Sequence, residues 1–265
     1  MTVFGTAIDM NLIREWVTEA GGIALSQTAD RSVEIKSDHT PVTEIDRQVE
    51  AFLLEKIDRH YPSHGVLAEE GGSRPGSDFM WIIDPIDGTR AFASGLPIWG
   101  ISMGVFHLGE PYAGVFYMPV TGDLFWGTRE QAFHNELPLV PQETVDLNSS
   151  LAYITVPSSF HRYFNTSFRR LRSFGSATAH LAYVAYGLAT GTVTRRIRIW
   201  DLAPVLPYLG MARIKLVYFN GEPFHAMDLL QGRAAAQPLV AAHESIIDEV
   251  LGHITIKPGA EDNVD

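Results

Sequence analysis

Two aspartates stand three residues apart at the end of an apolar run, in the stretch Trp-Ile-Ile-Asp-Pro-Ile-Asp-Gly-Thr of residues 81–89. The run at residues 81–83 predicts a buried strand. Pro85, between Asp84 and Asp87, fixes its own φ and restricts the residue before it to an extended shape. Two carboxylates are therefore expected on a stiff turn that follows a buried strand.

Gly88 and Thr89 continue this turn. Gly88 supplies backbone freedom, and Thr89 can begin a short helix. Backbone N–H groups at a helix start bind phosphate oxygens, and carboxylate oxygens are the ligands that Mg²⁺ prefers. The stretch thus predicts a site where a divalent cation and a phosphate meet, although Asp, Pro and Gly are also favoured in turns for purely local reasons.

Further carboxylates lie on either side of this stretch. Glu69-Glu70-Gly71 precedes it, and Trp200-Asp201 follows far downstream in an apolar setting. Together these pieces resemble the inositol monophosphatase family of Mg²⁺-dependent, lithium-sensitive phosphatases. The signature of that family is the same Asp-Pro-Ile-Asp-Gly-Thr block with an upstream Glu-Glu and a downstream Trp-Asp.

The resemblance implies a metal centre of two or three Mg²⁺ ions, with Mn²⁺ as a substitute. Glu69, Asp84 and the carbonyl of Ile86 are expected to hold the first ion. Asp84, Asp87 and Asp201 are expected to hold the second.

The resemblance also implies the catalytic roles. Glu69 and Thr89 are expected to position and activate the attacking water, with Asp46 orienting Thr89 or serving a third metal. Asp87 and the N–H groups of Gly88 and Thr89 are expected around the phosphate. From the sequence alone, Asp46 is equally well explained as the capping residue of a helix.

Only one of the adjacent residues Glu69 and Glu70 is expected to face the metal. Residues 64–68 predict a short strand, and neighbouring side chains on a strand point to opposite faces. The resemblance implies that Glu69 faces inward as the metal ligand and that Glu70 supports it. Lys36 and Asp38, on a polar loop, can reach the same cluster, but solvated loop charges are the simpler interpretation.

Ser176 and Ala177 open a predicted helix just after Gly175. The resemblance implies that this small-residue segment contacts substrate. A serine N-cap preceded by a glycine is the local alternative.

Thr194 marks the main departure from the family. Inositol-specific members carry a glutamate there, which binds inositol hydroxyls. Arg195, Arg196 and Arg198 follow instead, and they either contact a second anionic group or are solvated charges. A strand over residues 193–199 would place Arg196 and Arg198 on one face and Arg195 on the other.

Composition narrows the functional classes. The chain has 265 residues, is 46 % hydrophobic and carries a net charge of −11, with a pI near 5.3. An acidic chain is a poor general nucleic-acid binder and needs cations to hold an anionic substrate. It has no cysteine, and hence no thiolate nucleophile. No signal peptide or membrane span is expected, and the resemblance adds a cytoplasmic location and a homodimer.

Two amphipathic helices are expected first, beginning at Asp9 and at Thr43, the second ending before Pro62. Close turns between the following strands predict antiparallel pairing. These strands are expected at residues 98–108, 111–118 and 124–128.

The pattern weakens near residues 138–148, which predicts a boundary between a first part, 1–140, and a second part, 141–265. Alternating strands and helices in the second part predict an α/β layer. The fold class expected for the whole chain is α/β (α+β), a five-layer α-β-α-β-α sandwich with the site between the halves. In the second part we expect strands at 152–156, 214–219 and 239–242, and helices at 160–171, 177–189, 202–211 and 245–251.

The function expected is Mg²⁺-dependent hydrolysis of a small phosphate monoester, that is, a phosphoric monoester hydrolase of the inositol-phosphate type acting on a small phosphorylated metabolite. Histidinol phosphate is the first alternative substrate, because residues 94–100 resemble the segment after the signature in that branch. Fructose 1,6-bisphosphate and 3′-phosphoadenosine 5′-phosphate are further alternatives, since the arginines suit bisphosphates. The alternative of another class is a regulatory protein- or RNA-binding module with little turnover.

Overall fold

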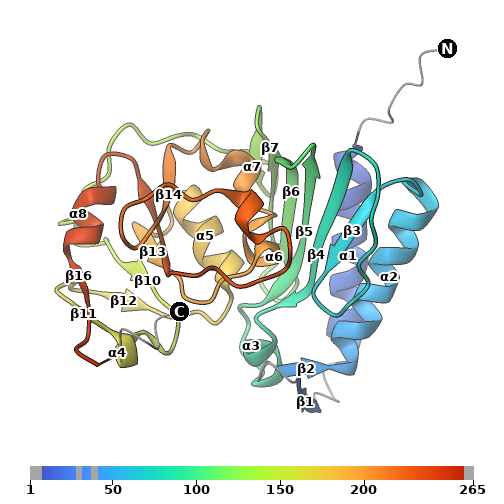
Figure 1. Cartoon of the computed structure of the whole chain (residues 1–265), viewed down its shortest axis with the longest axis horizontal. Coiled ribbons are helices and arrows are strands. Elements are labelled where there is room, and N and C mark those ends of the chain that lie inside the picture. The colour runs from blue at the N-terminus through green and yellow to red at the C-terminus, as the bar shows by residue number, and fades with distance from the viewer. Residues whose placement is uncertain (1–7, 28–31, 37–40, 260–265) are drawn as a thin grey trace.

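The computed structural model describes residues 8–27, 32–36 and 41–259. Its elements form five layers, seen edge-on in Figure 1 as helix, sheet, helix, sheet and helix. The prediction of a five-layer α/β sandwich is confirmed. In the described part of the chain, no helix has both the length and the apolar character needed to cross a membrane.

The first layer consists of α1 (Met10–Ser26) and α2 (Glu44–His60). Asp9 caps α1 through a 2.9 Å hydrogen bond from the Asn11 N–H. Thr43 caps α2 in a reciprocal box with Asp46. Both helices begin at the predicted residues because short polar side chains there satisfy N–H groups that have no partner within the helix.

The second layer is a seven-stranded sheet in the order β3-β4-β5-β6-β7-β8-β9. The predicted antiparallel pairing is correct except at one edge, where β3 and β4 run parallel. The connection of residues 69–78 returns the chain to the start of β3 before β4 begins. The strands are β3 (Gly65–Ala68), β4 (Phe79–Asp87), β5 (Gly100–His107), β6 (Glu110–Met118), β7 (Asp123–Thr128), β8 (Ala132–His134) and β9 (Leu137–Pro138).

The fourth layer is a five-stranded mixed sheet in the order β12-β10-β13-β15-β14. Helices α5 to α7 lie between the two large sheets, and α8 covers the outer face (Figure 1). The strands are β10 (Ile154–Thr155), β12 (Leu171–Arg172), β13 (Gly191–Val193), β14 (Ile214–Tyr218) and β15 (Leu239–His243). The helices are α5 (Ala177–Ala185), α6 (Ile199–Leu202), α7 (Leu206–Leu209) and α8 (Ile247–Gly252).

Smaller elements complete the chain. Two further sheets have two strands each and pair β1 with β2 and β11 with β16. These elements are β1 (Val33–Ile35), β2 (Pro41–Thr43), α3 (Thr89–Ala93), α4 (Phe160–Tyr163), β11 (Phe164–Thr166), the 3₁₀ turn Ala226–Leu229 and β16 (Ile254–Ile256). The division of the chain at residues 140 and 141 stays a prediction.

Three predicted elements of the second half are wrong. The helix expected over 160–171 ends after α4, because β11 then pairs with the distant β16. The helix expected over 202–211 is broken between α6 and α7. The strand expected over 193–199 ends at Val193, and Arg196 then adopts a left-handed φ of 54°, which no strand accommodates. The alternation of faces expected for the arginines therefore does not apply.

The link between α6 and α7 lies directly against the seven-stranded sheet. A Cβ added to Gly104 on β5 would come within 2.4 Å of the Ala203 Cβ, and one added to Gly114 on β6 within 2.1 Å of the Pro204 carbonyl oxygen. These two glycines let the backbone approach closely. The approach brings the start of α6, and with it Asp201, beside the end of β4.

Candidate active site

One cleft of about 220 Å³ lies between the end of β4 and the start of α6. It collects residues from the end of β3, the end of β4, the start of α3 and the start of α6. Most of the residues predicted for metal, phosphate and substrate binding line it: Glu69, Asp84, Ile86, Asp87, Gly88, Thr89, Arg196, Arg198 and Asp201, together with Pro41, Arg90, Gly175 and Trp200.

Strand β4 delivers Asp84 and Asp87 as the turn chemistry predicts. Its pairing with β5 shifts register between these two residues, and the Ile86 N–H donates a 3.0 Å hydrogen bond to Asp84 Oδ1. Gly88 then adopts a φ of 93° and precedes α3. Both carboxylates are almost completely buried, with 2 % and 4 % of their surface exposed.

Asp201 reaches the same place from the start of α6. The Arg198 N–H donates a 2.6 Å hydrogen bond to Asp201 Oδ2. The backbone is fixed from two other elements, by the Thr178 hydroxyl on the Asp201 carbonyl (2.9 Å) and by the Ser102 hydroxyl on the Trp200 carbonyl (3.0 Å). The sequence analysis missed Thr178 and Ser102, because neither belongs to a motif.

The start of α5 holds Asp87 in place. The Ser176 hydroxyl and the N–H of Thr178 both donate to Asp87 Oδ2, the latter at 2.9 Å, and the Ala177 N–H lies 3.3 Å from Oδ1. The Ser176 hydroxyl also caps α5, accepting from the Ala179 N–H at 2.9 Å. Ser176 and Ala177 thus orient a carboxylate across the junction, and their predicted contact with substrate stays a prediction.

The carboxylates form a dense acidic cluster. Asp84, Asp87 and Asp201 each offer an oxygen within 4.8 Å of the others. Burial and the neighbouring carboxylates raise the pKa of Asp84 well above its usual range, and the same two causes act on Asp201. Burial also raises the pKa of Asp87, although the hydrogen bonds from Ser176 and Thr178 act to lower it. Because oxygen ligands crowded in this way favour a hard divalent cation, the residues fit Mg²⁺.

Glu69 and Glu70 do not obey the expected alternation. Strand β3 ends at Ala68, so both glutamates lie in the following turn. The Lys36 ammonium contacts both, at 3.0 Å from Glu69 Oε1 and 2.7 Å from Glu70 Oε1. Lys36 is therefore more than a solvated loop charge, whereas Asp38 lies outside the described residues. Only Glu69 lines the cleft.

Glu50, on α2, supports this turn and was also missed. Its carboxylate accepts hydrogen bonds from the N–H groups of Glu70 (2.8 Å) and Gly72 (3.0 Å). Burial raises the pKa of Glu50, and the same cause raises those of Glu69 and Glu70 despite the nearby lysine. The turn is therefore a second acidic group beside the aspartate cluster.

Asp46 caps α2 and also contacts Thr89 of the signature turn. Its Oδ2 accepts from the Thr43 N–H at 2.8 Å, which completes the α2 cap. Its Oδ1 lies 3.3 Å from the Thr89 hydroxyl, which is also 3.1 Å from the Ile86 carbonyl. Burial raises the pKa of Asp46 to about 6. The hydroxyl of Thr89 thus lies between a helix cap and the signature turn.

An adjoining cavity of about 170 Å³ shares Gly175, Arg196 and Asp201 with the cleft. Thr194 lines it and is buried, with its hydroxyl 3.3 Å from the Leu239 carbonyl. Arg195 also lines it and packs its guanidinium 3.9 Å from the centre of the Tyr163 ring. The substrate-binding roles of Thr194, Arg196 and Arg198 stay predictions.

Comparison with known proteins agrees with this geometry. The model of the inositol monophosphatase family matches residues 9–254. The chain belongs to the inositol monophosphatase family. Its members include phosphatases of small phosphorylated molecules, so a phosphatase role for the acidic cleft is supported at the level of the family.

Three similar members of the inositol monophosphatase family illustrate the range of proteins that this chain resembles. The chain is 32 % identical to the inositol-1-monophosphatase of Bacillus subtilis over 93 % of this chain and 97 % of that one. It is 32 % identical to the histidinol-phosphatase of Chlorobaculum parvum over 75 % and 81 %. The solved structure of the Thermotoga maritima IMPase superposes with a TM-score of 0.79 at 27 % identity, covering 92 % and 95 %.

Proposed function

We propose that this member of the inositol monophosphatase family is a Mg²⁺-dependent phosphoric monoester hydrolase. The observation that carries the proposal is the convergence of three largely buried aspartates, Asp84, Asp87 and Asp201, within 4.8 Å of one another. Phosphate esters resist hydrolysis because their negative charge repels a nucleophile, and positive charge at the site removes that obstacle.

The residues that would hold the metal follow from the cleft. Glu69, Asp84 and the Ile86 carbonyl would bind one Mg²⁺, and Asp84, Asp87 and Asp201 a second. A third ion would lie toward Asp46. When bound, these ions neutralise the phosphate and make water a stronger nucleophile near neutral pH, and Mn²⁺ is expected to replace them in part.

The remaining chemistry belongs to side chains and N–H groups of the cleft. Glu69 accepts a proton from the attacking water. Thr89 orients that water through its hydroxyl, which is itself directed by Asp46 Oδ1. The N–H groups of Gly88 and Thr89, beside Asp87, bind the phosphate oxygens. No protein nucleophile is required.

The substrate differs from that of an inositol-specific enzyme. The buried Thr194 donates to a backbone carbonyl and cannot replace a charged carboxylate that binds two hydroxyl groups. Arg196 and Arg198 line the cleft and favour a substrate with a second anionic group. Ser176 and Ala177 would lie along the leaving group, in the adjoining cavity.

Histidinol phosphate and bisphosphates are therefore the alternative substrates to inositol monophosphate. The former gains support from residues 94–100 and from the related histidinol-phosphatase. The two arginines support a sugar or nucleotide bisphosphate. A regulatory protein- or RNA-binding role with little turnover is the alternative of another class.

A phosphate-release assay decides among these functions. The purified chain is tested with inositol 1-phosphate, histidinol phosphate, fructose 1,6-bisphosphate and 3′-phosphoadenosine 5′-phosphate, in Mg²⁺, in Mn²⁺ and in chelator. We expect activity with Mg²⁺, less with Mn²⁺ and none after chelation. Asp58→Asn, an exposed carboxylate outside the cleft, is the matched control for Asp84→Asn.

Two outcomes would overturn the proposal. Undiminished hydrolysis in chelator would remove the metal from the mechanism. The absence of turnover on all four esters, in a folded protein that still binds Mg²⁺, would favour the regulatory role. We further propose that the protein is a homodimer in the cytoplasm. Light scattering on the purified protein tests the dimer, and cell fractionation tests the location.

A further inference from the structure

Positive charge is unevenly distributed in this acidic chain. Residues 147–200 contain no Asp, Glu or Lys but seven arginines, although the whole chain has 31 acidic against 20 basic residues. Some of these arginines line the catalytic cleft. Two others, Arg169 and Arg170, lie at a different place, between β11 and β12.

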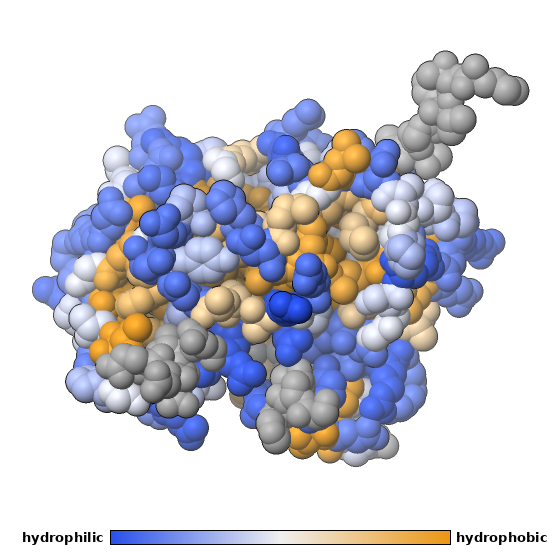
Figure 2. Space-filling view, in the orientation of Figure 1, coloured by the Kyte–Doolittle hydropathy of each residue, from blue (hydrophilic) through white to orange (hydrophobic). Residues whose placement is uncertain are grey.

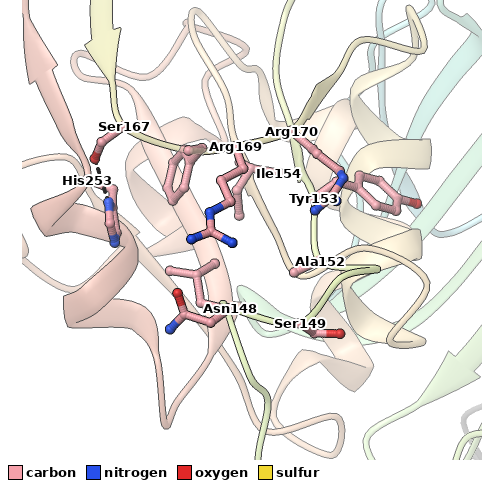
Figure 3. Close-up of a pocket in the computed structure, with 11 residues that line it drawn as sticks. Asn148, Ser149, Ala152, Tyr153, Ile154, Ser167, Arg169, Arg170 and His253 are labelled. Atoms are coloured by element: carbon pink, nitrogen blue, oxygen red, sulfur yellow. Dashed lines mark hydrogen bonds between the residues drawn. The ribbon is translucent and has the colours of Figure 1, made fainter.

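A second cavity, of about 230 Å³, lies at Arg169 and Arg170. It shares no lining residue with the catalytic cleft. Figure 3 shows the Arg169 side chain reaching into the middle of the cavity toward Asn148, with Arg170 on the wall beside Tyr153. The remaining lining residues are Leu147, Ser149, Ala152, Ile154, Ser167, Phe168 and His253.

Among the described residues, the two arginines of this cavity have no acidic partner, whereas several other arginines of the chain do. Arg14, Arg47 and Arg213, for example, all form ion pairs with glutamates. Within the described part of the chain, by contrast, neither Arg169 nor Arg170 has an ion pair or a side-chain hydrogen bond, and no Asp or Glu lines their cavity. Their donors therefore remain available to a ligand.

Neutral polar groups surround these charges. Asn148 offers an amide, and Ser149 and Ser167 offer hydroxyls. The Ser167 hydroxyl is hydrogen-bonded to His253 Nδ1 at 2.5 Å, and Glu249 Oε1 lies 4.0 Å from Nε2 of the same ring. Hydroxyl, amide and guanidinium groups together match the several oxygens of a phosphate.

The walls and the volume limit the size of the ligand. The ring of Phe168 and the side chains of Leu147 and Ile154 give the cavity an apolar side. A volume of about 230 Å³ is below the usual range for drug-sized ligands, roughly 300–1,000 Å³. The cavity therefore suits a phosphate group alone or one attached to a small sugar, rather than a dinucleotide.

We infer that this cavity is a binding site for a phosphate dianion, separate from the catalytic cleft, in which Arg169 is the principal contact and Arg170 assists. The ligand is either free phosphate or a small phosphorylated metabolite. Planar guanidinium groups bind phosphate oxygens through two parallel hydrogen bonds, which explains the choice of arginine over lysine at both positions.

The test is calorimetric titration of the full chain in chelator, with inorganic phosphate, ribose 5-phosphate and uncharged ribose. Without metal, the carboxylates of the catalytic cleft repel phosphate, so this site is observed alone. We expect saturable binding of one phosphate ligand with a Kd of about 1 mM or tighter, and none of ribose. The ratio of affinities for the two phosphates identifies which source the site prefers.

Variants assign the binding to the cavity. Arg169→Ala should raise the Kd at least tenfold and Arg170→Ala by a smaller factor. Arg162→Ala removes an exposed arginine of the same acid-free segment outside the cavity and should change the Kd less than twofold. Thermal melting of each variant confirms its fold, since exposed side chains are rarely essential to stability.

Three results would overturn the inference: no saturable binding, a Kd unchanged in Arg169→Ala, or loss of binding in Arg196→Ala, which would place the ligand in the catalytic cleft. The titration involves neither Mg²⁺ nor turnover. Failure of the proposed phosphatase activity would therefore leave this result unaffected.

Discussion

Glu69 and Glu70 are adjacent in the sequence and share the Lys36 ammonium, yet their surroundings differ. Glu69 lines the cleft with Asp84, and the backbone N–H of Glu70 is bound by Glu50 behind it. A carboxylate that takes a proton from water contributes roughly 10²–10⁴-fold to a rate, whereas a supporting ion pair contributes much less. The position of each glutamate therefore predicts how much activity depends on it.

We expect Glu69→Gln to lower kcat by about two to four orders of magnitude and Glu70→Gln by clearly less. Glutamine keeps the size of the side chain and removes its charge, so both proteins should fold. Phosphate release at saturating Mg²⁺ measures the ranking, and melting curves show that both variants are folded. The opposite ranking would mean that Glu70 is the residue that faces the metal.

Arg196 and Arg198 lie in the cleft under different constraints. Arg198 stacks 5.3 Å from the Trp200 ring centre and donates to the Gly232 carbonyl at 3.2 Å, so part of its binding capacity is engaged. Arg196 has a left-handed φ of 54°, and its side chain forms no ion pair or hydrogen bond within the described residues, so its donors are available to a ligand. Arg196 is thus the better candidate for a contact with substrate.

We expect Arg196→Ala to lower kcat/KM for a bisphosphate about ten- to a hundredfold, as the loss of one charge-assisted hydrogen bond predicts. Inositol 1-phosphate should be a poorer substrate than the bisphosphate, and its kcat/KM should fall less in this variant. Arg198→Ala should have an intermediate effect, and Arg162→Ala, outside the cleft, none. If inositol 1-phosphate is the best substrate and neither cleft variant changes the order, the arginines are surface charges.

At the level of secondary structure, the start of α2 serves both the helix and the cleft. Asp46 completes the helix cap with Thr43 and at the same time faces the Thr89 hydroxyl. The cap fixes the direction of the carboxylate because two donors of Thr43 hold one of its oxygens. Stability and activity should therefore change together when the cap is altered.

Thr43→Ala should reduce the free energy of unfolding by about 0.5–2 kcal/mol, the usual cost of a lost cap, and should also reduce kcat. Thr43→Ser keeps the hydroxyl and should restore most of both. Denaturant unfolding and phosphate release on the same preparations give the two numbers. A fully active Thr43→Ala would show that the cap does not position Asp46 for catalysis.

The sequence predicts elements well where their causes are local. Helices α1 and α2 follow from caps and periodic apolar residues, and β4 with its turn follows from Pro85 and Gly88. Prediction failed where distant partners decide the structure. Strand β11 exists because β16 pairs with it, about ninety residues later, and periodicity within residues 160–171 carries no sign of that partner.

The same distinction holds for the cleft. Asp84 and Asp87 belong to one compact motif and could be identified from it. Glu69 and Asp201 lie outside that motif and were identified through the resemblance to the family, and the structure brings all four to one cleft. Thr178, Ser102 and Glu50 act through backbone groups of distant residues, and an isolated Ser, Thr or Glu in a sequence gives no sign of such a bond. Lys36 could be considered, but only its position between two carboxylates shows that it is engaged.

On the scale of the whole molecule, the acidic cluster costs stability when no cation balances it. Figure 2 shows polar residues around the edge of this face and apolar residues gathered across its middle. The buried apolar side chains stabilise the fold, and the buried carboxylates oppose it. Folded-state pKa values of Asp84 and Asp201 lie above the unfolded value of 3.8. The folded chain therefore binds these protons more tightly, and this contribution to stability is present at low pH and lost as the pH rises above about 4.

Asp84→Asn should isolate this effect in chelator. We expect its melting temperature to exceed that of the wild type by a few degrees at pH 8, since asparagine is never charged, and the difference to shrink toward pH 4.5. Addition of Mg²⁺ at pH 8 should raise the melting temperature of the wild type more than that of the variant, so that the wild type becomes the more stable of the two. The variant must be compared with the wild type at each pH because His180 also makes stability depend on pH. Burial lowers the pKa of His180 to about 4, so its contribution to stability is lost as the pH falls, the opposite of the aspartates.

If the difference between the two melting temperatures does not vary with pH, the charge of Asp84 is not the source of the destabilisation. An equal response of both proteins to Mg²⁺ would do the same. Asp78→Asn should follow the wild type throughout, because Asp78 is exposed and has no ion pair or side-chain hydrogen bond within the described residues.

The hydrogen bond from the Thr178 N–H to Asp87 Oδ2 makes one amide proton depend on the arrangement of the whole molecule. An N–H in the first turn of a helix normally has no partner within that helix and exchanges readily with solvent deuterium. Here its partner, Asp87, belongs to β4 of the seven-stranded sheet, so the proton is protected only while β4 and α5 remain together. The exchange rate of this single proton therefore reports how often α5 and β4 separate, under native conditions and without any substrate.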